Sequence, residues 1–148
     1  MDRKIAVFAG SFDPFTIAHR DVAKRGCAIF DELIILIANN INKKTLFSAE
    51  ERAEFAKASM KDTPNVSVKI WEGLTVDFLK DRNIKFLVRG VRNASDLEWE
   101  QSVAWNNEKL LPGVETVFFG SKQEHLHISS SVVRELIKYD KEVGGLRG

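Results

Sequence analysis

The feature that most constrains the fold is a repeated alternation of short apolar runs with helix-like stretches along the chain. The run LIILIA, at residues 33–38, contains no polar residue, which is typical of a strand covered on both faces. Longer segments with helical periodicity separate this run from the other apolar runs. Five strands are predicted in all, at residues 5–9, 33–38, 66–70, 86–90 and 116–120.

A helix is predicted after each strand, at residues 17–30, 47–60, 74–81, 94–111 and 129–139. Ser48 and Glu51 have the spacing of a capping box, which marks a helix start. Strands that alternate with helices form a parallel sheet with helices on both faces, because each connection crosses over the sheet. A length of 148 residues suits one core. We therefore predict a single α/β domain over residues 1–148, with a Rossmann-like, doubly wound, five-stranded parallel sheet.

Charge and composition argue against several kinds of partner. The chain has 22 basic and 21 acidic residues, so it lacks the basic footprint of a nucleic-acid or membrane-surface protein. The longest apolar run is too short to cross a bilayer, and Asp13 and Pro14 interrupt the first one too early for a secretory signal. The single cysteine, Cys27, allows no internal disulfide and is expected to pack as a small apolar side chain. We expect a cytoplasmic protein that binds neither nucleic acid nor membranes.

Polar segments follow all of the predicted strands. Open parallel sheets bind ligands outside the carboxyl ends of their strands, so these segments are expected to meet at one edge. They are rich in glycine, hydroxyl, basic and histidine residues, which suit phosphate groups. In chain order they read GSFDPFTIAH, NNINKK, WEGLT, RGVRNASD and GSKQEHLHISSS.

The first polar segment contains neither G-x-G-x-x-G nor the G-x-x-x-x-G-K-[ST] phosphate loop. Gly10 lets the backbone approach a ligand, and Ser11 offers a hydroxyl and an N–H. His19 falls in the first turn of a predicted helix, where the dipole favours anions. On these residues alone, a simple turn with a surface cap explains the segment equally well. The serines at 129–131, taken alone, are more typical of a helix cap than of a phosphate site.

Together, the motifs resemble those of a known family. GSFDPFTIAH is similar to the nucleotidyltransferase signature in which a G-[ST]-F-D-P turn leads to an [HT]-x-G-H element. VRGVRNASDLEWE and HISSS resemble the two later motifs of the phosphopantetheine adenylyltransferases. FDELIILIA, KKTLFSAEER and GLTVDF fit the same family in order and spacing, so the resemblance runs from Ile5 to about Leu146.

The resemblance implies a reaction in which the adenylyl group of ATP passes to 4′-phosphopantetheine, giving dephospho-coenzyme A and pyrophosphate. His19, Lys43 and Arg92 are the expected catalytic residues, as cationic groups that stabilise charge at the α-phosphate. The residues expected to bind the phosphopantetheine are Ser11, Lys43, Thr75 and Arg89. Those expected to bind ATP are Ser11, Phe12, His19, Gly90, Val91, Arg92, Glu100, His125, Leu126, His127, Ile128, Ser129, Ser130 and Ser131.

This chemistry needs alignment and charge stabilisation rather than a covalent nucleophile on the protein. The attacking phosphate is already ionised at neutral pH, which agrees with the lack of a Ser-His-Asp or Cys-His pattern. Mg²⁺ is expected to enter bound to the ATP phosphates, so no residue is assigned to a metal. His125 and His127 have no cysteine or third ligand nearby, which disfavours a zinc site.

The sequence also allows other functions. A sister nucleotidyltransferase would use CTP and glycerol phosphate, or nicotinamide mononucleotide; Thr16, RGVR and ISSS favour phosphopantetheine instead. A nucleotide sensor without catalysis is a third reading, against which the retained histidine, lysine and arginines argue. By resemblance we also expect a homohexamer, with coenzyme A as a competing ligand.

The chain departs from the family pattern in places. Ala18 stands where the signature has glycine, so an extra methyl group is expected at the adenine side of the pocket. HLH precedes ISSS where the family commonly has an aromatic, a serine and another aromatic. Trp71, Trp99 and Trp105 are expected to be packing residues rather than a platform for stacking bases.

Overall fold

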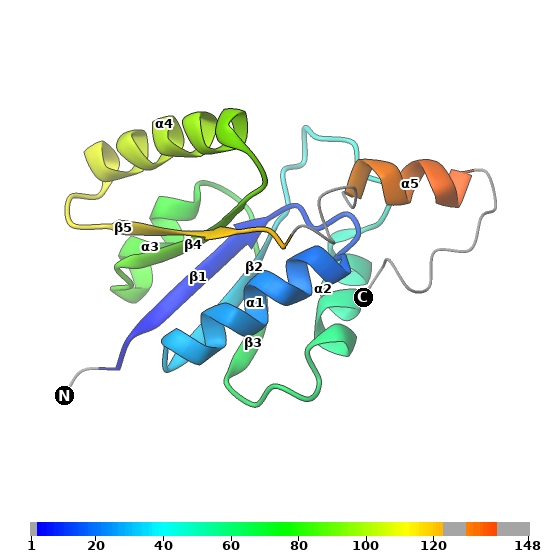
Figure 1. Cartoon of the computed structure of the whole chain (residues 1–148), viewed down its shortest axis with the longest axis horizontal. Coiled ribbons are helices and arrows are strands. Elements are labelled where there is room, and N and C mark those ends of the chain that lie inside the picture. Colours follow the sequence, from blue (N-terminus) through cyan, green and yellow to red (C-terminus); the bar gives the residue numbers. More distant parts are fainter. Residues whose placement is uncertain (1–2, 123–129, 139–148) are drawn as a thin grey trace.

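Five parallel strands form one sheet in the computed structural model, which describes residues 3–122 and 130–138 (Figure 1). The strand order is β3-β2-β1-β4-β5, so the chain winds outward from β1 in both directions. The predicted single Rossmann-like α/β domain is confirmed. Along the chain the elements are β1 (Ile5–Gly10), α1 (Ile17–Ile29), β2 (Glu32–Ala38), α2 (Ala49–Ser59), β3 (Val66–Trp71), α3 (Thr75–Arg82), β4 (Phe86–Val91), α4 (Ala94–Leu110), β5 (Glu115–Gly120) and α5 (Ser130–Lys138).

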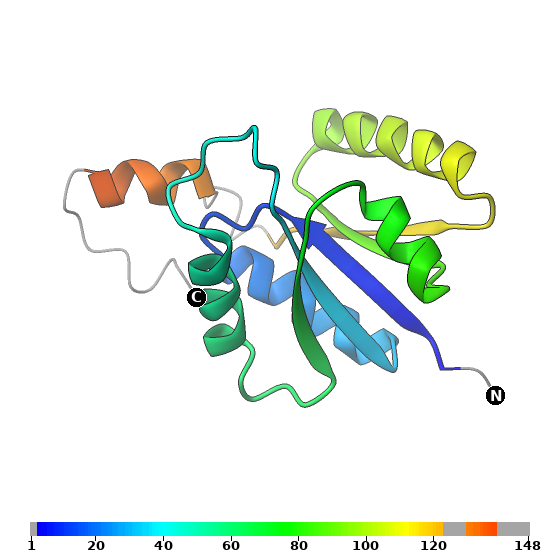
Figure 2. The same ribbon diagram turned by 180° about the vertical axis from the view of Figure 1, so that it is seen from behind.

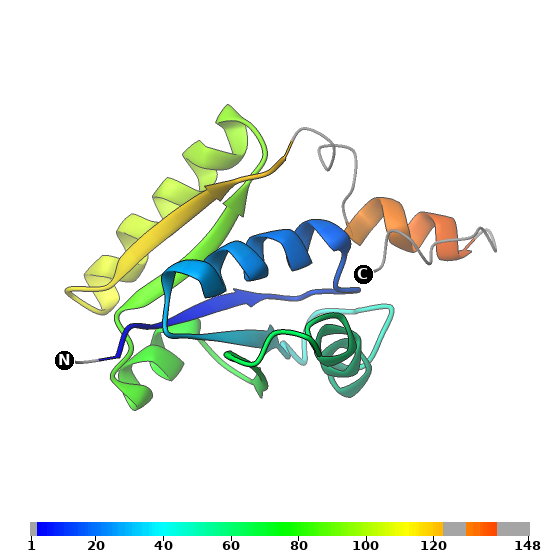
Figure 3. The same ribbon diagram turned by 60° about the horizontal axis from the view of Figure 1, so that its bottom comes forward.

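Helices cover both faces of the sheet. On one face, Val22 of α1 and Ala53 of α2 pack into a cluster with apolar side chains of β1 and β2. On the other face, Phe78 and Leu79 of α3 pack against the alternate side chains of the same strands. Figure 3 shows α1 along one side of β1 and α3 on the opposite side. Because β1 and β2 are covered twice, their sequences are continuously apolar.

The pairing of β1 opens a gap at the carboxyl end of the sheet. The β1–β2 ladder continues to the pair Gly10 and Ile37. The β1–β4 ladder ends earlier, at Phe8 and Val88. Beyond that pair, β1 and β4 are no longer paired, at the point where the strand order reverses. A crevice at this point is the usual ligand site of a doubly wound sheet.

One prediction about the tryptophans is wrong. Helix α4 lies at the edge of the sheet over β4 and β5 (Figure 2), and of its 17 residues, all of them described, only Glu100 is buried. Trp99 is 68% and Trp105 is 62% exposed, because a helix at a sheet edge buries only one narrow stripe. Trp71 does pack as predicted, with its ring 5.2 Å from that of Phe78.

The structure confirms the predicted capping box at Ser48 and the predicted packing of Cys27. Ser48 accepts the Glu51 N–H at 3.1 Å and Glu51 accepts the Ser48 N–H at 3.0 Å, so the capping box forms. Cys27 packs against the core, and burial raises the pKa of its thiol to about 11, as expected of a packed side chain rather than a nucleophile. No helix within residues 3–122 and 130–138 is long and apolar enough to cross a membrane.

Candidate active site

A cavity of about 510 Å³ opens where β1 and β4 stop pairing. It is lined by the loop after β1, the start of α1, the loop after β2, the end of β4 and the first turns of α4 and α5. The sequence-predicted residues that line it are Ser11, Phe12, His19, Lys43, Arg89, Gly90, Arg92, Glu100, Ser130 and Ser131. Ala18 also lines it, at the start of α1.

Other predicted residues do not line this cavity. Thr75 lines a neighbouring, smaller cavity. Val91 is described but does not line the larger cavity. His125, Leu126, His127, Ile128 and Ser129 lie outside the described residues.

His19 is positioned by a cap at the start of α1. Thr16 is the N-cap residue, and its hydroxyl accepts the His19 backbone N–H at 3.3 Å. The Thr16 backbone N–H in turn donates to Nδ1 of the His19 ring at 2.9 Å. Because Nδ1 accepts this hydrogen bond, the proton of the neutral ring is on Nε2. The cap therefore sets both the orientation and the tautomer of His19.

His19 is uncharged at neutral pH, which differs from the cationic role expected from the sequence. Its pKa is lowered from 6.5 to about 4, first because the ring is buried and then because Arg89 and Arg92 are nearby. The ring lies in an aromatic cage, with centroids 4.9 Å from Phe12 and 5.5 Å from Phe15. His19 can thus donate a hydrogen bond from Nε2 without carrying a charge.

Phe12 lines the cavity, and its side chain supports His19. Its side chain is only 4% exposed, and its ring packs edge-on against His19. Its φ of 49° is unusual for a residue with a bulky side chain, and a strained backbone of this kind is often found at functional sites. A Cβ on Gly10 would come within 3.2 Å of the Phe12 ring, so a larger residue at this position would require that ring to shift.

Lys43 reaches the cavity from the loop after β2. Its Nζ donates to the Ser11 hydroxyl at 2.9 Å, across 32 positions of sequence. Lys44 does not line the cavity, so Lys43 is the one of the two lysines placed at the candidate site. The tertiary structure thus joins two of the polar segments that follow different strands.

Arg89 and Glu100 form a two-pronged ion pair inside the site. Nε and one terminal nitrogen of Arg89 each lie 2.7 Å from a carboxylate oxygen of Glu100. The other terminal nitrogen donates to the Ala9 carbonyl at 2.6 Å. Glu100 is 8% exposed. Its carboxylate is therefore occupied by Arg89, and it fixes the direction of that guanidinium.

The same ion pair separates the larger cavity from a smaller one. The second cavity, of about 210 Å³, is lined by Arg89, Glu100 and Thr75, together with residues of α3, α4, β4 and β5. Leu74, Val76, Leu87, Val103 and Leu110 make it mostly apolar, and Asn107 adds an amide. We call the larger cavity the polar chamber and the smaller cavity the apolar chamber. The charged pair Arg89–Glu100 lines both of them and forms the wall that they share.

The start of α4 and the start of α5 complete the polar chamber. Arg92 pairs with Asp96, with its Nε 3.2 Å from the carboxylate. The Ser130 hydroxyl donates a hydrogen bond to the Pro14 carbonyl at 2.9 Å, which holds α5 against the loop after β1. The Ser131 hydroxyl accepts a hydrogen bond from Arg134 at 3.0 Å.

Several lining residues were missed by the sequence reasoning. Arg134 donates to the Asp13 carbonyl at 2.6 Å, so it holds α5 against the loop after β1. Asp96 and Ser121 also line the cavity. A signal was available for Arg134, because it follows Ser130 by one helical turn and so shares its face. The partnership of Arg92 with Asp96 has the same helical spacing.

Comparison with known proteins identifies the class to which this fold and site belong. A family model described as cytidylyltransferase-like matches residues 7–136. The chain is 47% identical over 141 residues to a phosphopantetheine adenylyltransferase of Dictyoglomus thermophilum, covering 95% of this chain and 86% of that relative. It is 42% identical over 142 residues to one of Cytophaga hutchinsonii, covering 96% and 95% of the two chains. The chain belongs to the phosphopantetheine adenylyltransferase family.

A solved structure supports the fold. The crystal structure of the lipopolysaccharide core biosynthesis protein from Thermoplasma volcanium GSS1 superposes with a TM-score of 0.61, at 17% sequence identity. The match covers 82% of this chain and 100% of that one. At this identity the likeness concerns the fold alone.

Proposed function

We propose that this chain transfers the adenylyl group of ATP to 4′-phosphopantetheine, releasing pyrophosphate and forming dephospho-coenzyme A. The observation that carries the proposal is the pair of chambers that share the Arg89–Glu100 wall. Its membership of the phosphopantetheine adenylyltransferase family supports the same reaction. The polar chamber suits the triphosphate of ATP, and the apolar chamber suits the pantetheine arm.

In this proposal His19 acts on the α-phosphate of ATP. As the acceptor phosphate attacks, negative charge grows on the α-phosphate oxygens, and hydrogen-bond donors held in place stabilise it. Nε2–H of His19 is such a donor, because Thr16 occupies Nδ1. A neutral donor requires no charge to be buried before the substrates bind, and two anionic substrates would raise the pKa of the ring.

Lys43 and Arg92 supply positive charge on either side of this donor. Both line the polar chamber, Lys43 from the loop after β2 and Arg92 from the loop after β4. They offset the repulsion between the acceptor phosphate and the anionic triphosphate, which would otherwise keep the reacting groups apart. The backbone N–H groups at the start of α5 offer a further seat for the leaving pyrophosphate.

Arg89 is placed to bind the phosphate of 4′-phosphopantetheine. It lies on the wall between the chambers, where an acceptor whose arm fills the apolar chamber would present its phosphate to the α-phosphate of ATP. Thr75 and Asn107 would then meet the polar groups of the arm. Glu100 contributes by holding Arg89 in this direction.

We also propose that Mg²⁺ enters the site bound to the phosphates of ATP. Asp96 and Glu100 both line the polar chamber, and their carboxylates already form ion pairs. Asp96 pairs with Arg92, and Glu100 pairs with Arg89. Within the described residues no group of three His, Cys, Asp or Glu side chains could hold a metal ion. The donor set thus fits an ion carried by the nucleotide, which would supply charge neutralisation at the phosphates.

We further propose that the protein is a homohexamer and that it is cytoplasmic. We also propose that coenzyme A competes with the substrates for the site. Self-association is supported by the exposed apolar side chains of α4, including Trp99 and Leu110. Competition by coenzyme A is supported by the two chambers, because it carries the same pantetheine arm as the acceptor. The lone free cysteine, Cys27, agrees with a reducing compartment.

The reaction is tested by pyrophosphate release with different substrate pairs. ATP and 4′-phosphopantetheine should give release in the presence of Mg²⁺. CTP with glycerol phosphate, and ATP with nicotinamide mononucleotide, represent the sister enzymes, which the family comparison does not favour. Release with one of those pairs alone would reject the proposal, as would ATP binding without release from any pair.

A further inference from the structure

Arg52, on α2, is a buried charged residue outside the predicted site. It is 2% exposed. Its guanidinium donates to three backbone carbonyls, those of Ser11 at 2.8 Å, Ala38 at 2.9 Å and Phe47 at 3.1 Å. Within residues 3–122 and 130–138, no carboxylate forms an ion pair with it. A buried cation without a counter-ion is costly unless its donors are satisfied, so these bonds tie the carbonyls firmly to α2.

The three carbonyls belong to the segments that carry the phosphate end of the site. Ala38 ends β2 and Phe47 lies just before α2, so Arg52 holds both ends of the loop that carries Lys43. Ser11 is the residue whose hydroxyl Lys43 contacts. Arg52 thus ties the loop that carries Lys43 and the loop that carries Ser11 to the same guanidinium group.

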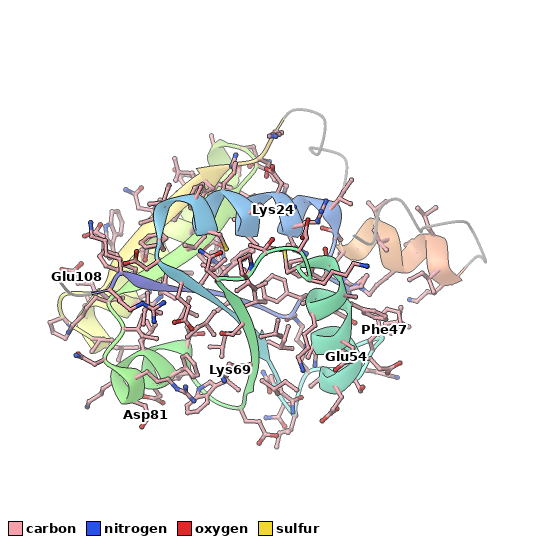
Figure 4. All side chains as sticks on the ribbon, turned by 90° about the horizontal axis from the view of Figure 1, so that it is seen from below. Lys24, Phe47, Glu54, Lys69, Asp81 and Glu108 are labelled. Carbon is pink, nitrogen blue, oxygen red and sulfur yellow. The ribbon has the colours of Figure 1, made fainter. Side chains whose placement is uncertain are left out.

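Asp13 also holds the loop that carries Lys43. Its carboxylate is almost fully buried and accepts the backbone N–H groups of Leu46 at 2.9 Å and Phe47 at 3.0 Å. Phe47, which is labelled in Figure 4 beside α2, is therefore held through both its N–H and its C=O. The loop is anchored at its base while Lys43 itself is exposed.

We propose that Arg52 is a positioning residue for the adenylyl transfer, because it holds the loop of Lys43 against Ser11. It does not line the larger cavity, so it acts without touching the substrates. The inference rests on the proposed function for its catalytic consequence, because only that reaction gives Lys43 its task. Removing the three-way contact should let the lysine loop move relative to Ser11 and His19. A misplacement of about 1 Å near reacting groups costs on the order of 10²-fold in rate.

Amide hydrogen exchange tests the hold on the loop without any activity. Arg52→Met removes the charge and the donors, and Arg52→Lys keeps the charge but loses the planar fork. Met60→Ala is the matched control, because Met60 is buried at the far end of the same helix. The amides of Leu46 and Phe47 should exchange at least tenfold faster in both Arg52 variants than in the control. Equal exchange in the control and the variants would overturn the proposal.

Kinetics then test the catalytic consequence. In pyrophosphate release, kcat/KM should fall about 10- to 100-fold at most in Arg52→Met and Arg52→Lys, no further than in Lys43→Ala and divided between kcat and KM in the same way. In a Lys43→Ala background the same changes should have little further effect, since the residue acts through Lys43. Additive losses would overturn the proposal, and so would wild-type turnover in Arg52→Lys, which would mean that charge alone matters. If Arg52→Met does not fold, Arg52→Lys carries both measurements. If the wild-type protein releases no pyrophosphate, the proposed function fails, while the exchange rates still decide whether Arg52 holds the loop.

Discussion

His19 and Lys43 reach the same cavity from regions that enclose their side chains to very different extents. His19 is built into a capped helix and enclosed by aromatic rings, and its Nδ1 is occupied by Thr16. Lys43 is exposed on a loop, and its described side-chain contact is with the Ser11 hydroxyl. One region holds a neutral donor in a fixed direction, and the other brings an exposed charge to the same cavity.

The contrast suggests a division of labour between directional and diffuse stabilisation. A donor with a fixed direction is most useful in the transition state, where charge appears at a defined oxygen. A flexible ammonium can follow an anionic ligand from binding to release, but it is screened by salt and loses side-chain entropy. The two residues should therefore respond differently to substitution.

The largest effect is expected for His19→Ala. Turnover should fall by about 10² to 10³, the usual cost of losing one preorganised donor, while the KM for ATP changes little. Steady-state pyrophosphate release gives both parameters, and circular dichroism checks that α1 still forms. A loss carried by KM instead would mean that His19 binds the ground state, and the contrast with Lys43 would disappear.

Lys43→Ala should have a smaller and more evenly distributed effect. We expect kcat/KM to fall by about 10- to 100-fold, shared between kcat and the KM for both substrates, because the charge acts at every stage. Lys44→Ala is the matched control on the same loop and should stay near wild type. The assignment fails if Lys44→Ala is the more impaired of the two.

Arg89→Ala should mainly affect the acceptor side. The KM for 4′-phosphopantetheine should rise about tenfold, and the protein should lose about 1–3 kcal/mol of stability because Glu100 is left buried and unpaired. Adding Glu100→Gln should recover part of the stability but none of the acceptor affinity. An unchanged KM for the acceptor in Arg89→Ala would reject the placement of its phosphate on this wall.

A pH dependence of stability that comes from His19 is also expected, in addition to the effects on the reaction. Its pKa is about 4 in the folded protein and 6.5 in an unfolded chain, the ordinary value for histidine, so between these values the unfolded chain takes up a proton that the folded chain does not. Stability should therefore decrease as the pH falls through this window, by up to about 3 kcal/mol from this residue. Urea unfolding at about pH 7 and about pH 4 measures it. His19→Gln should lack this component, and equal losses in both proteins would contradict the burial of the ring.

Much of the fold follows from local sequence patterns. The five apolar runs become the five strands, and the Ser48–Glu51 spacing becomes a capping box, because periodicity and capping depend on neighbouring residues. The polar segments after β1, β2 and β4 and the start of α5 meet in one cavity, as a parallel sheet requires. Trp99 and Trp105 could not be placed in this way, because their exposure depends on how little of α4 the sheet edge covers.

The amino-acid order alone was enough to specify the alternation of strands and helices and the segments that gather at the phosphate site, since these depend on short-range periodicity and turn chemistry. The chemical state of the site depended on contacts between distant parts of the chain. The neutral ring of His19 results from burial and from the charges of Arg89 and Arg92, and Arg89 bonds to Ala9, 80 positions away. The carbonyl contacts of Arg52 reach as far as Ser11. Burial and electrostatic interaction act through space, so they become defined only once the sheet has brought these residues together.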